Sequence, residues 1–531
     1  MTALQERPAP AADHEDLATL GYNQELRRDL GNFASFAAGF SFVSILTTVF
    51  QLFAFGFSFG GPAFFWTWPV VFVGQIMVAL VFAELAATYP IAGCIFQWSR
   101  RLGGAFVGWF AGWFMMIGYI VSVAAIAIAL QSVLPEVWSG FQLISGDSAL
   151  DTRSGATNAI VLGTVLIVVA TIISALGVKR MAAINAAGVV IEIIGVVLLI
   201  ILLFAHSERG PAVVNETNGV QGNGSYVWPL LASALMAAYV MYGFDSAAEL
   251  SEETKSPRKT APRAILIALI TSGVGGGLLL LATLMAAPDL LDPALSSEGV
   301  ASVVTAQMGE TLGKALLVIV AIAVISACLA IQNSASRVMF SMARDGVLPF
   351  SKQLAVVNPH TGTPVRTGVV VSAGAILVLL VNYGQAAVFT AVTSVAVVIV
   401  YLAYLFVTVP ALVQRYRHQR VVDLTEIDPD AAKHAFVLGR WGKPVNILAV
   451  VYGLAMLVNI GWPRDAVYDV EGNSTVLHYF PLIFTGGVLL VGVVAYLAIH
   501  ARRPAALDDP EAIAPDDAAM AGSGPAGAVR S

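Results

Sequence analysis

Two acidic side chains lie inside apolar stretches of this 531-residue chain: Asp245 in MYGFDSAAEL and Glu192 in INAAGVVIEIIGVVLL. An ionisable side chain within an apolar helix is costly to bury and by default indicates a functional role. Such a carboxyl group can bind a cation, or can take up and release a proton near neutral pH. Each residue also has a structural alternative, because Asp245 could cap a helix and Glu192 could be a protonated or hydrogen-bonded structural side chain.

A backbone break is predicted at Gly243 to Asp245, in the middle of the apolar stretch that contains them. A break in hydrocarbon leaves backbone N–H and C=O groups unpaired, so it is tolerated only where protein or a watery cavity covers them. Ser246 and Glu249 follow with the S-x-x-E spacing of a capping box, which predicts a new helix start after the break. We therefore expect two half-helices joined at residues 243–245.

A second interruption is predicted in FASFAAGFSFVSILTTVF, where Gly39, Ser41 and Ser44 interrupt the first apolar run. Two interrupted membrane helices five apart in order are typical of an inverted five-plus-five repeat, which holds its substrate between the breaks near the midplane. Half-helix N-termini there offer amides to an anion, and the opposing half-helix ends offer carbonyls to a cation. The predicted substrate-binding residues are Gly39, Ser41, Phe42, Val43, Ser44, Gly243, Phe244 and Asp245.

Two residues are predicted to gate this site. Glu84 lies near the expected cytoplasmic end of the second apolar run, with Arg100 and Arg101 in the next loop. That position favours an interfacial ion pair or an inner gate over a substrate ligand. Phe244, inside the predicted break, is the second candidate gate residue.

Aromatic and acidic residues flank the second break. Tyr119 and Tyr242 could cover a bound amine with their ring faces, or they could pack against neighbouring helices. Glu249, Glu252 and Glu253 are expected to cap and solvate the end of the sixth apolar run.

The composition indicates a polytopic all-α membrane protein, because 57% of the residues are hydrophobic, 12% are charged and the mean hydropathy is +0.79. Runs of about 20 apolar residues can cross about 30 Å of hydrocarbon as a helix. Twelve such runs lie at about 33–57, 64–88, 105–131, 158–177, 183–205, 226–251, 262–287, 315–341, 367–383, 388–413, 446–462 and 479–499. Residues 1–30 are polar and charged, so no cleavable signal peptide is expected.

Lys and Arg residues predict the orientation, because cytoplasmic loops are enriched in them. With the N-terminus inside, four of the 28 fall in outer loops: Arg153, Arg209, Lys314 and Arg464. We therefore expect a plasma-membrane protein with both termini cytoplasmic. Its parts would be an N-terminal tail at 1–29, a membrane domain at 30–503 and a disordered tail at 504–531.

Several function classes lack their sequence signals. The net charge of -6 gives no nucleic-acid signal, and Cys94 and Cys328 lie at membrane or cytoplasmic depth, where a structural disulfide is not expected. The chain has no G-x-x-x-x-G-K-[ST] phosphate loop and no H-E-x-x-H metal motif. A channel would need repeated filters, and none is visible. We expect neither an enzyme nor a cofactor or metal site, and the oligomeric state stays open.

Three motifs resemble those of the amino acid, polyamine and organocation permease superfamily. They are AELAATYPIAGCIFQWSRRLGG from Ala83, GFDSAAELSEETKSPRKTAPRAI from Gly243 and SRVMFSMARDGVLPF from Ser336. The chain most resembles the branch that carries amino acids, 4-aminobutyrate and choline. The resemblance covers nearly all of 22–503 and implies a leucine-transporter-type fold, with ten core helices and two more at the C-terminus. Many members have a G-x-G-like turn where this chain reads Gly39-Phe40-Ser41-Phe42, so an amine substrate stays open beside an α-amino acid.

The resemblance implies a secondary transporter that imports an amino acid or related amine by alternating access. Glu192 falls where some proton-coupled and cationic-amino-acid members carry a lysine that bridges the first and eighth spans. With Asp245, it favours H⁺ over Na⁺ as the coupling ion. An exchanger, or a sodium symporter of choline, ethanolamine or polyamine, is the alternative.

Overall fold

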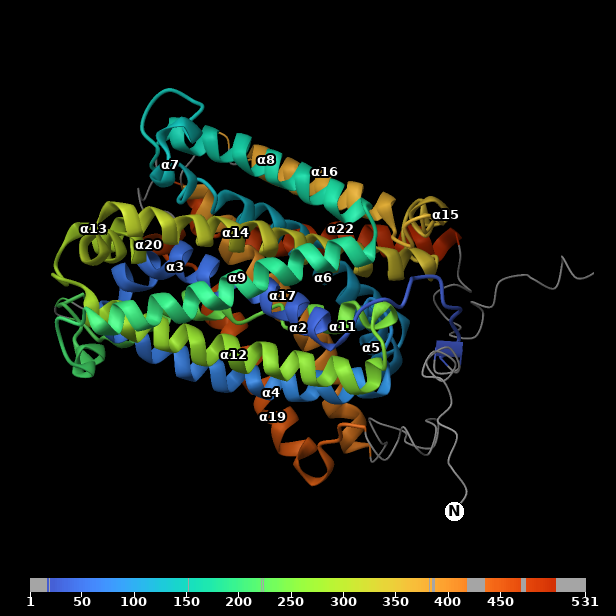
Figure 1. Ribbon diagram of the computed structural model, residues 1–531. Coiled ribbons are helices and arrows are strands. Elements are labelled where there is room, and N and C mark those ends of the chain that lie inside the picture. Colours follow the sequence, from blue (N-terminus) through green and yellow to red (C-terminus); the bar gives the residue numbers. More distant parts are fainter. Residues whose placement is uncertain are drawn as a thin grey trace, which may run out of the picture.

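The computed structural model describes residues 17–18, 20–150, 152–220, 222, 224–381, 383, 387–417, 435–468 and 474–502. Within these ranges the chain is helical apart from turns and loops, with one isolated bridge between Leu30 and Thr254. Most of the predicted tails, 1–29 and 504–531, lies outside the described residues. The long helices lie roughly along one axis (Figure 1). Residues 20–31 lie with α5 and α15 at one end of this bundle, which we call the N-terminal face, and α7 and α13 lie at the other.

The first half of the chain forms the following elements: α2 (Asn32–Val43), α3 (Ile45–Gly60), η1 (Pro62–Trp66), α4 (Thr67–Thr88), α5 (Cys94–Gly103), α6 (Ala105–Ile128), α7 (Leu134–Val137), η2 (Ser139–Phe141), α8 (Arg153–Ala175), α9 (Val178–Ala205), η3 (Pro211–Asn215), α10 (Val227–Val240), α11 (Ser246–Glu249) and η4 (Ser251–Glu253). The second half forms α12 (Pro257–Ala286), α13 (Pro293–Ser297), α14 (Val300–Arg344), α15 (Ser351–Leu354), α16 (Val365–Val381), α17 (Ala387–Tyr416), η5 (Gly439–Trp441), α19 (Gly442–Gly461), α20 (Asp465–Tyr468), α21 (Thr475–His478) and α22 (Phe480–Arg502). Within α14, Gly309 has non-helical dihedrals and separates two helical parts.

Ten helices of the described chain are long and apolar enough to cross a membrane. They cover Asn32–Gly60, Pro62–Thr88, Ala105–Ile128, Arg153–Ala175, Val178–Ala205, Pro257–Ala286, Val300–Arg344, Ser394–Tyr416, Gly439–Gly461 and Phe480–Ile499. Two shorter apolar helices, Val227–Val240 and Val365–Leu380, overlap the other two predicted runs, 226–251 and 367–383. The architecture is therefore that of a polytopic all-α membrane protein.

The first helix pair breaks at Ser44, whose φ of 37° and ψ of 82° place it in the left-handed region. Gly39 and Ser41, which were predicted to share the interruption, lie inside the regular helix α2. A Cβ at Gly39 would lie 3.1 Å from Ala268 and 3.3 Å from Ala247, so this glycine permits close helix packing. The first break is therefore narrower than the sequence predicted, and it separates α2 from α3 at one residue.

The second break covers Met241 to Asp245, between α10 and the four-residue helix α11. The predicted capping box is wrong. Asp245 occupies the N-cap position without a side-chain capping bond, and the Ser246 hydroxyl donates to the Ala38 carbonyl at 3.1 Å. Glu249 accepts a hydrogen bond from the Cys94 amide at 3.2 Å. Ser246 and Glu249 thus form hydrogen bonds with the neighbouring helices α2 and α5, and not with amides of their own helix.

Neighbouring helices enclose both breaks. The helix α12 packs on α2 and α4, α14 packs on α6 and α9, and α17 packs on α6 and α19. The last helix is peripheral, because only 6% of its most apolar window is buried, compared with 83% for α6. The breaks lie inside the bundle, whereas α22 turns apolar side chains outward.

Candidate functional site

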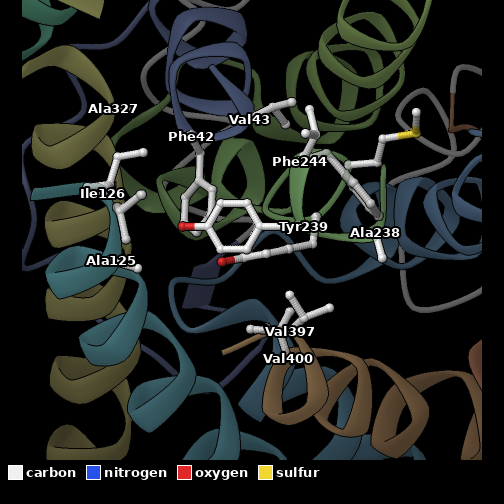
Figure 2. Close-up of a cluster of buried hydrophobic side chains, with 14 of the residues drawn as sticks. Phe42, Val43, Ala125, Ile126, Ala238, Tyr239, Phe244, Ala327, Val397 and Val400 are labelled. Atoms are coloured by element: carbon white, nitrogen blue, oxygen red, sulfur yellow. The ribbon is translucent and has the colours of Figure 1, made fainter. Parts of the chain in front are cut away.

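The two helix breaks are in direct contact. A Cβ at Gly243, where φ is 90°, would lie 1.9 Å from Cδ1 of Phe42, so glycine admits the Phe42 ring to the second break. Figure 2 shows Phe42 and Val43 close to Phe244 and Tyr239, surrounded by side chains of α6, α14 and α17. All four residues are buried. The structure thus brings together the hydrophobic residues that the sequence predicted for the substrate site.

Aromatic rings line this region. Phe42 lies 5.1 Å from Tyr119 and 5.9 Å from Tyr242 between ring centroids. The Phe244 ring lies 5.6 Å from that of Tyr404. These distances fall in the range of packed aromatic pairs, so the rings form two packed groups beside the breaks.

Asp245 is fully buried at the second break, and two tyrosine hydroxyls donate hydrogen bonds to its carboxylate. Tyr119 of α6 donates to Oδ2 at 2.5 Å, and Tyr404 of α17 donates to Oδ1. The Tyr404 hydroxyl also accepts a bond from the Gly243 amide at 2.9 Å. The sequence had singled out Tyr119. Tyr404 was missed, since a tyrosine within an apolar run carries little signal of which way it faces.

Glu249 and Cys94 extend the polar cluster around Asp245. The Cys94 thiol lies 2.9 Å from Oε1 of Glu249, and both side chains are buried. Ligand atoms of Cys94, Asp245 and Glu249 lie within 4.8 Å of one another, close enough to share a proton or to hold a small cation. The prediction that Glu249, Glu252 and Glu253 are solvated is wrong, because all three are buried between packed helices.

Glu192 of α9 is bound to the first break. Its Oε1 accepts hydrogen bonds from the Ser44 hydroxyl at 2.9 Å and from the Leu46 amide at 3.2 Å. Its Oε2 has no hydrogen-bond partner among the described residues. The amide of Leu46 belongs to the first turn of α3, where the sequence predicted an anion-binding helix terminus. Because Glu192 already accepts a hydrogen bond from that amide, fewer amides at this helix terminus are available to a substrate carboxylate.

The other predicted residues also lie near the breaks. Val43 is the last residue of α2, and Ser41, one turn before Ser44, is buried with no partner for its hydroxyl in the described part of the chain. Gly39 faces α11 and α12, where its role is packing.

Glu84 forms the predicted kind of contact, but with a different partner. It pairs with Arg415 of α17, and its Oε1 accepts a bond from the Leu438 amide at 2.9 Å. Arg100, which the sequence proposed as a neighbour, pairs with Asp345 at 2.8 Å. The packing of α17 near the end of α4 brings Arg415 to Glu84, although the two residues are 331 positions apart.

Ion pairs close the N-terminal face. Glu252 pairs with Arg344 at 2.8 Å, and Glu253 pairs with Arg337 at 3.0 Å. Arginine forks satisfy buried carboxylates through several hydrogen bonds, which offsets the loss of water. This network was not predicted from the sequence, because the partners of each pair lie on segments that are far apart in the chain.

The N-terminal segment joins the same network through Tyr22. Its hydroxyl donates to Asp345 at 3.0 Å, and Arg344 lies 4.2 Å from the centre of its ring. Burial and the Asp345 carboxylate raise the pKa of Tyr22 to about 12, so the hydroxyl stays a proton donor. The segment thereby covers the N-terminal face.

The comparisons with known proteins agree with this architecture. Residues 30–489 match the amino acid permease family. An uncharacterized amino-acid permease of Schizosaccharomyces pombe is 27% identical, over 92% of this chain and 84% of its own. The amino-acid permease BAT1 homolog of Oryza sativa subsp. japonica is 29% identical, over 91% and 95%. The thiamine transporter thi9 of S. pombe is 25% identical, over 92% and 86%.

The motif resemblance is thereby confirmed, and relatives with such names indicate transport rather than enzymatic activity. Together with the ten long apolar helices, the matches identify a multi-pass membrane protein. The chain belongs to the amino acid permease family, within the amino acid, polyamine and organocation superfamily.

Proposed function

We propose that this protein is a secondary active transporter that imports an amino acid or related amine across the plasma membrane, coupled to proton influx. The observation that carries the proposal is Asp245, a fully buried carboxylate at a helix break, enclosed by aromatic rings. A buried anion needs a cation or a proton to offset its loss of water. The ammonium group of an amine supplies that cation.

The proposed fold has twelve spans and a leucine-transporter-type repeat. In its support, the breaks at Ser44 and at 241–245 fall in the first and sixth predicted spans, which an inverted five-plus-five repeat requires. The two short apolar helices supply the spans that the ten long ones lack. We place the N-terminal face in the cytoplasm because most Lys and Arg loops lie on that side of the predicted topology.

The substrate amine would lie against Asp245 and the rings of Phe42, Tyr242 and Phe244. Ring faces attract cations through their quadrupoles, which adds to the attraction of the carboxylate. The substrate carboxylate has weaker support, because Glu192 already accepts the Leu46 amide at the first break. The site therefore selects for the positive end of the ligand more clearly than for the negative end.

Glu192 is the proposed proton carrier. Its carboxylate accepts two hydrogen bonds from the break at Ser44, and its second oxygen, which has no partner in the described part of the chain, would take the proton. Protonation would weaken both bonds, because charge-assisted hydrogen bonds are about twice as strong as neutral ones. The protonation state of Glu192 would thus set how firmly the first break is held during alternating access.

A second candidate function is transport of an organic cation such as choline, ethanolamine or a polyamine, by exchange or with Na⁺. The aromatic surface beside Asp245 favours it, since ring faces bind alkylated ammonium groups well. The similarity to a thiamine transporter is compatible with it, because thiamine carries a permanent positive charge. The oxygens of Asp245 and Glu249 would suit a small cation.

Uptake into proteoliposomes tests these alternatives. The purified full chain is reconstituted, and radiolabelled 4-aminobutyrate, lysine, choline and putrescine are supplied with an imposed pH or Na⁺ gradient. We expect accumulation of an amino acid or amine that depends on a pH gradient, acid outside. Accumulation that requires Na⁺ would favour the symport alternative, and exchange without net accumulation would favour the exchanger. Transport of none of these compounds would contradict the proposed substrate class.

A further inference from the structure

Three buried polar atoms on α2 and α9, two helices that pack together, have no hydrogen-bond partner in the described part of the chain. They are Oδ1 of Asn185, Oγ of Ser41 and Oε2 of Glu192. Asn185 is 6% exposed, and the other two residues are fully buried. Nearly all buried polar atoms in proteins bind protein groups or ordered water. Three such atoms on two packed helices therefore indicate positions for water molecules.

The helix periodicity places these atoms in one row. Asn185 and Glu192 are seven residues apart on α9, so they share a face of that helix. Ala38 and Ser41 are three residues apart on α2 and also share a face. Ala38 and Asn185 line the same cavity, so the two faces meet. Ser41 lies one turn beyond Ala38, in the direction of the hydrogen bond between Ser44 and Glu192.

The cavity at Asn185 opens the row toward the N-terminal face. It has a volume of about 10 Å³, which suits one water molecule. Leu30 of the N-terminal segment and Asn333 of α14 also line it. A second cavity of about 10 Å³ shares Asn333 and is lined by Gln332, whose Oε1 has no partner among the described residues, and by Arg337. Asn333 thus lines both the cavity at Asn185 and the cavity at Arg337, which pairs with Glu253 at the N-terminal face.

Gly188 adds a further hydroxyl to this row. It lies between Asn185 and Glu192 on the same face of α9, and a Cβ there would lie 1.8 Å from Oγ of Ser326. The glycine therefore lets the Ser326 hydroxyl of α14 approach the backbone of α9. The row between Asn185 and Glu192 is bordered by hydroxyl groups from both α2 and α14.

The length of the row suits a short water chain. Seven residues of α-helix rise about 10 Å, and each hydrogen bond between oxygens spans about 2.8 Å. Two or three water molecules, together with the Ser41 hydroxyl, would join Asn185 to Glu192. The groups that contact the Glu192 carboxyl in the described chain are Ser44 and the Leu46 amide, neither of which is charged. Arg337, paired with Glu253, is the charged group at the far end.

We propose that ordered water molecules held by Asn185 and Ser41 form a proton path between Glu192 and the N-terminal face. The proposal rests on the proposed role of Glu192 as proton carrier. A proton leaves the Glu192 carboxyl to the nearest water, each water passes one proton to the next, and the last is released at the N-terminal face. Glu192 becomes a carboxylate that accepts the Ser44 and Leu46 bonds. Asn185 and Ser41 orient the waters and do not ionise, so both are positioning residues.

The test separates proton movement from substrate movement. The variants Asn185→Leu and Ser41→Ala are reconstituted in vesicles that contain a pH-sensitive dye. The substrate is the one of 4-aminobutyrate, lysine, choline and putrescine that the wild-type protein accumulates fastest. We expect Asn185→Leu to slow uptake driven by a pH gradient, and the accompanying proton influx, at least about tenfold. Ser41→Ala should slow both severalfold. For Asn185→Leu, counterflow of the same compound at equal pH should stay within about twofold, since exchange needs no net proton transfer.

Two further variants control for packing. Ser272→Ala removes another buried hydroxyl, on α12 and outside the row, that has no partner among the described residues, and it should leave both assays unchanged. Asn185→Ser keeps a polar group and should retain most of the pH-driven rate.

Three results would overturn the path. Asn185→Leu could keep the wild-type pH-driven rate, or it could lose pH-driven uptake and counterflow equally, which would assign Asn185 to helix packing. Ser41→Ala tests the row independently if Asn185→Leu does not fold. Wild-type uptake that ignores the pH gradient would refute the proton coupling itself, before any variant is compared.

Discussion

The role of Asp245 can be tested by Asp245→Asn, which keeps the shape of the side chain and removes its charge. The structure shows no capping bond from this side chain, so loss of a helix cap cannot account for an effect. The amide can still accept from one tyrosine, and its NH₂ can donate to the hydroxyl of the other. The interaction that disappears is the one between a carboxylate and a substrate ammonium group.

The expected magnitude follows from hydrogen-bond strengths. A bond to a charged group contributes about 1.5–3 kcal/mol, and a neutral one contributes about 0.5–1.5 kcal/mol. Replacing the first by the second costs about 1.4 kcal/mol, which corresponds to about tenfold in affinity. Burial of the site strengthens the charged interaction, because water does not screen it.

Equilibrium binding of the radiolabelled amine to purified protein is the assay, with folded yield followed by size-exclusion chromatography. Asp245→Asn should bind at least about tenfold more weakly at unchanged yield. Asp292→Asn is the matched control, because Asp292 is an acidic residue at the start of α13 on the opposite end of the bundle. It should bind as wild type does. Wild-type affinity in Asp245→Asn would refute substrate contact and would leave Asp245 as a structural link between α6 and α17.

Three other experiments test the remaining assignments. Glu192→Gln should abolish accumulation driven by a pH gradient and largely preserve counterflow, whereas loss of both in vesicle assays would indicate a structural role. A cysteine placed near Asn218 should react with an impermeant reagent outside intact cells, and one near Ser256 should not; the reverse pattern would contradict the proposed topology. Arg344→Gln leaves the buried Glu252 without its cation and should destabilise the protein by about 3–5 kcal/mol; an unchanged melting temperature of the purified protein would show that the pair contributes little.

Hydropathy predicted the membrane helices well because crossing hydrocarbon imposes a minimum length on every apolar run. All twelve predicted runs overlap a helix, although only ten helices among the described residues reach the length of a span. The second break was predictable because Gly243 and Asp245 stand together in an apolar run. The first was misjudged at Gly39, since a glycine needed for close packing against Ala247 and Ala268 looks the same in sequence as one needed for a turn.

Side-chain partners were harder to predict because they depend on tertiary packing. Glu84 was expected beside arginines that are close in sequence, but its partner Arg415 comes from a helix 331 residues away. The same difficulty concealed Tyr404, whose hydroxyl reaches Asp245 across 159 positions. Glu252 and Glu253 were expected in solvent because acids near a loop usually lie there, whereas arginines of α14 bury them.

The two buried acids differ in a way that separates their proposed roles. Both oxygens of Asp245 accept bonds from tyrosine hydroxyls, which can rotate toward other partners when a cation takes their place. Glu192 has one oxygen bound to the first break and one without a described partner. A carboxylate whose hydrogen-bond donors can rotate away suits a substrate that binds and dissociates in each transport cycle. An acid with one fixed and one open oxygen suits a proton, because it can change charge without leaving its place. Each break thus has one carboxyl group beside it. Because Phe42 contacts Gly243, a movement of either break would displace the other.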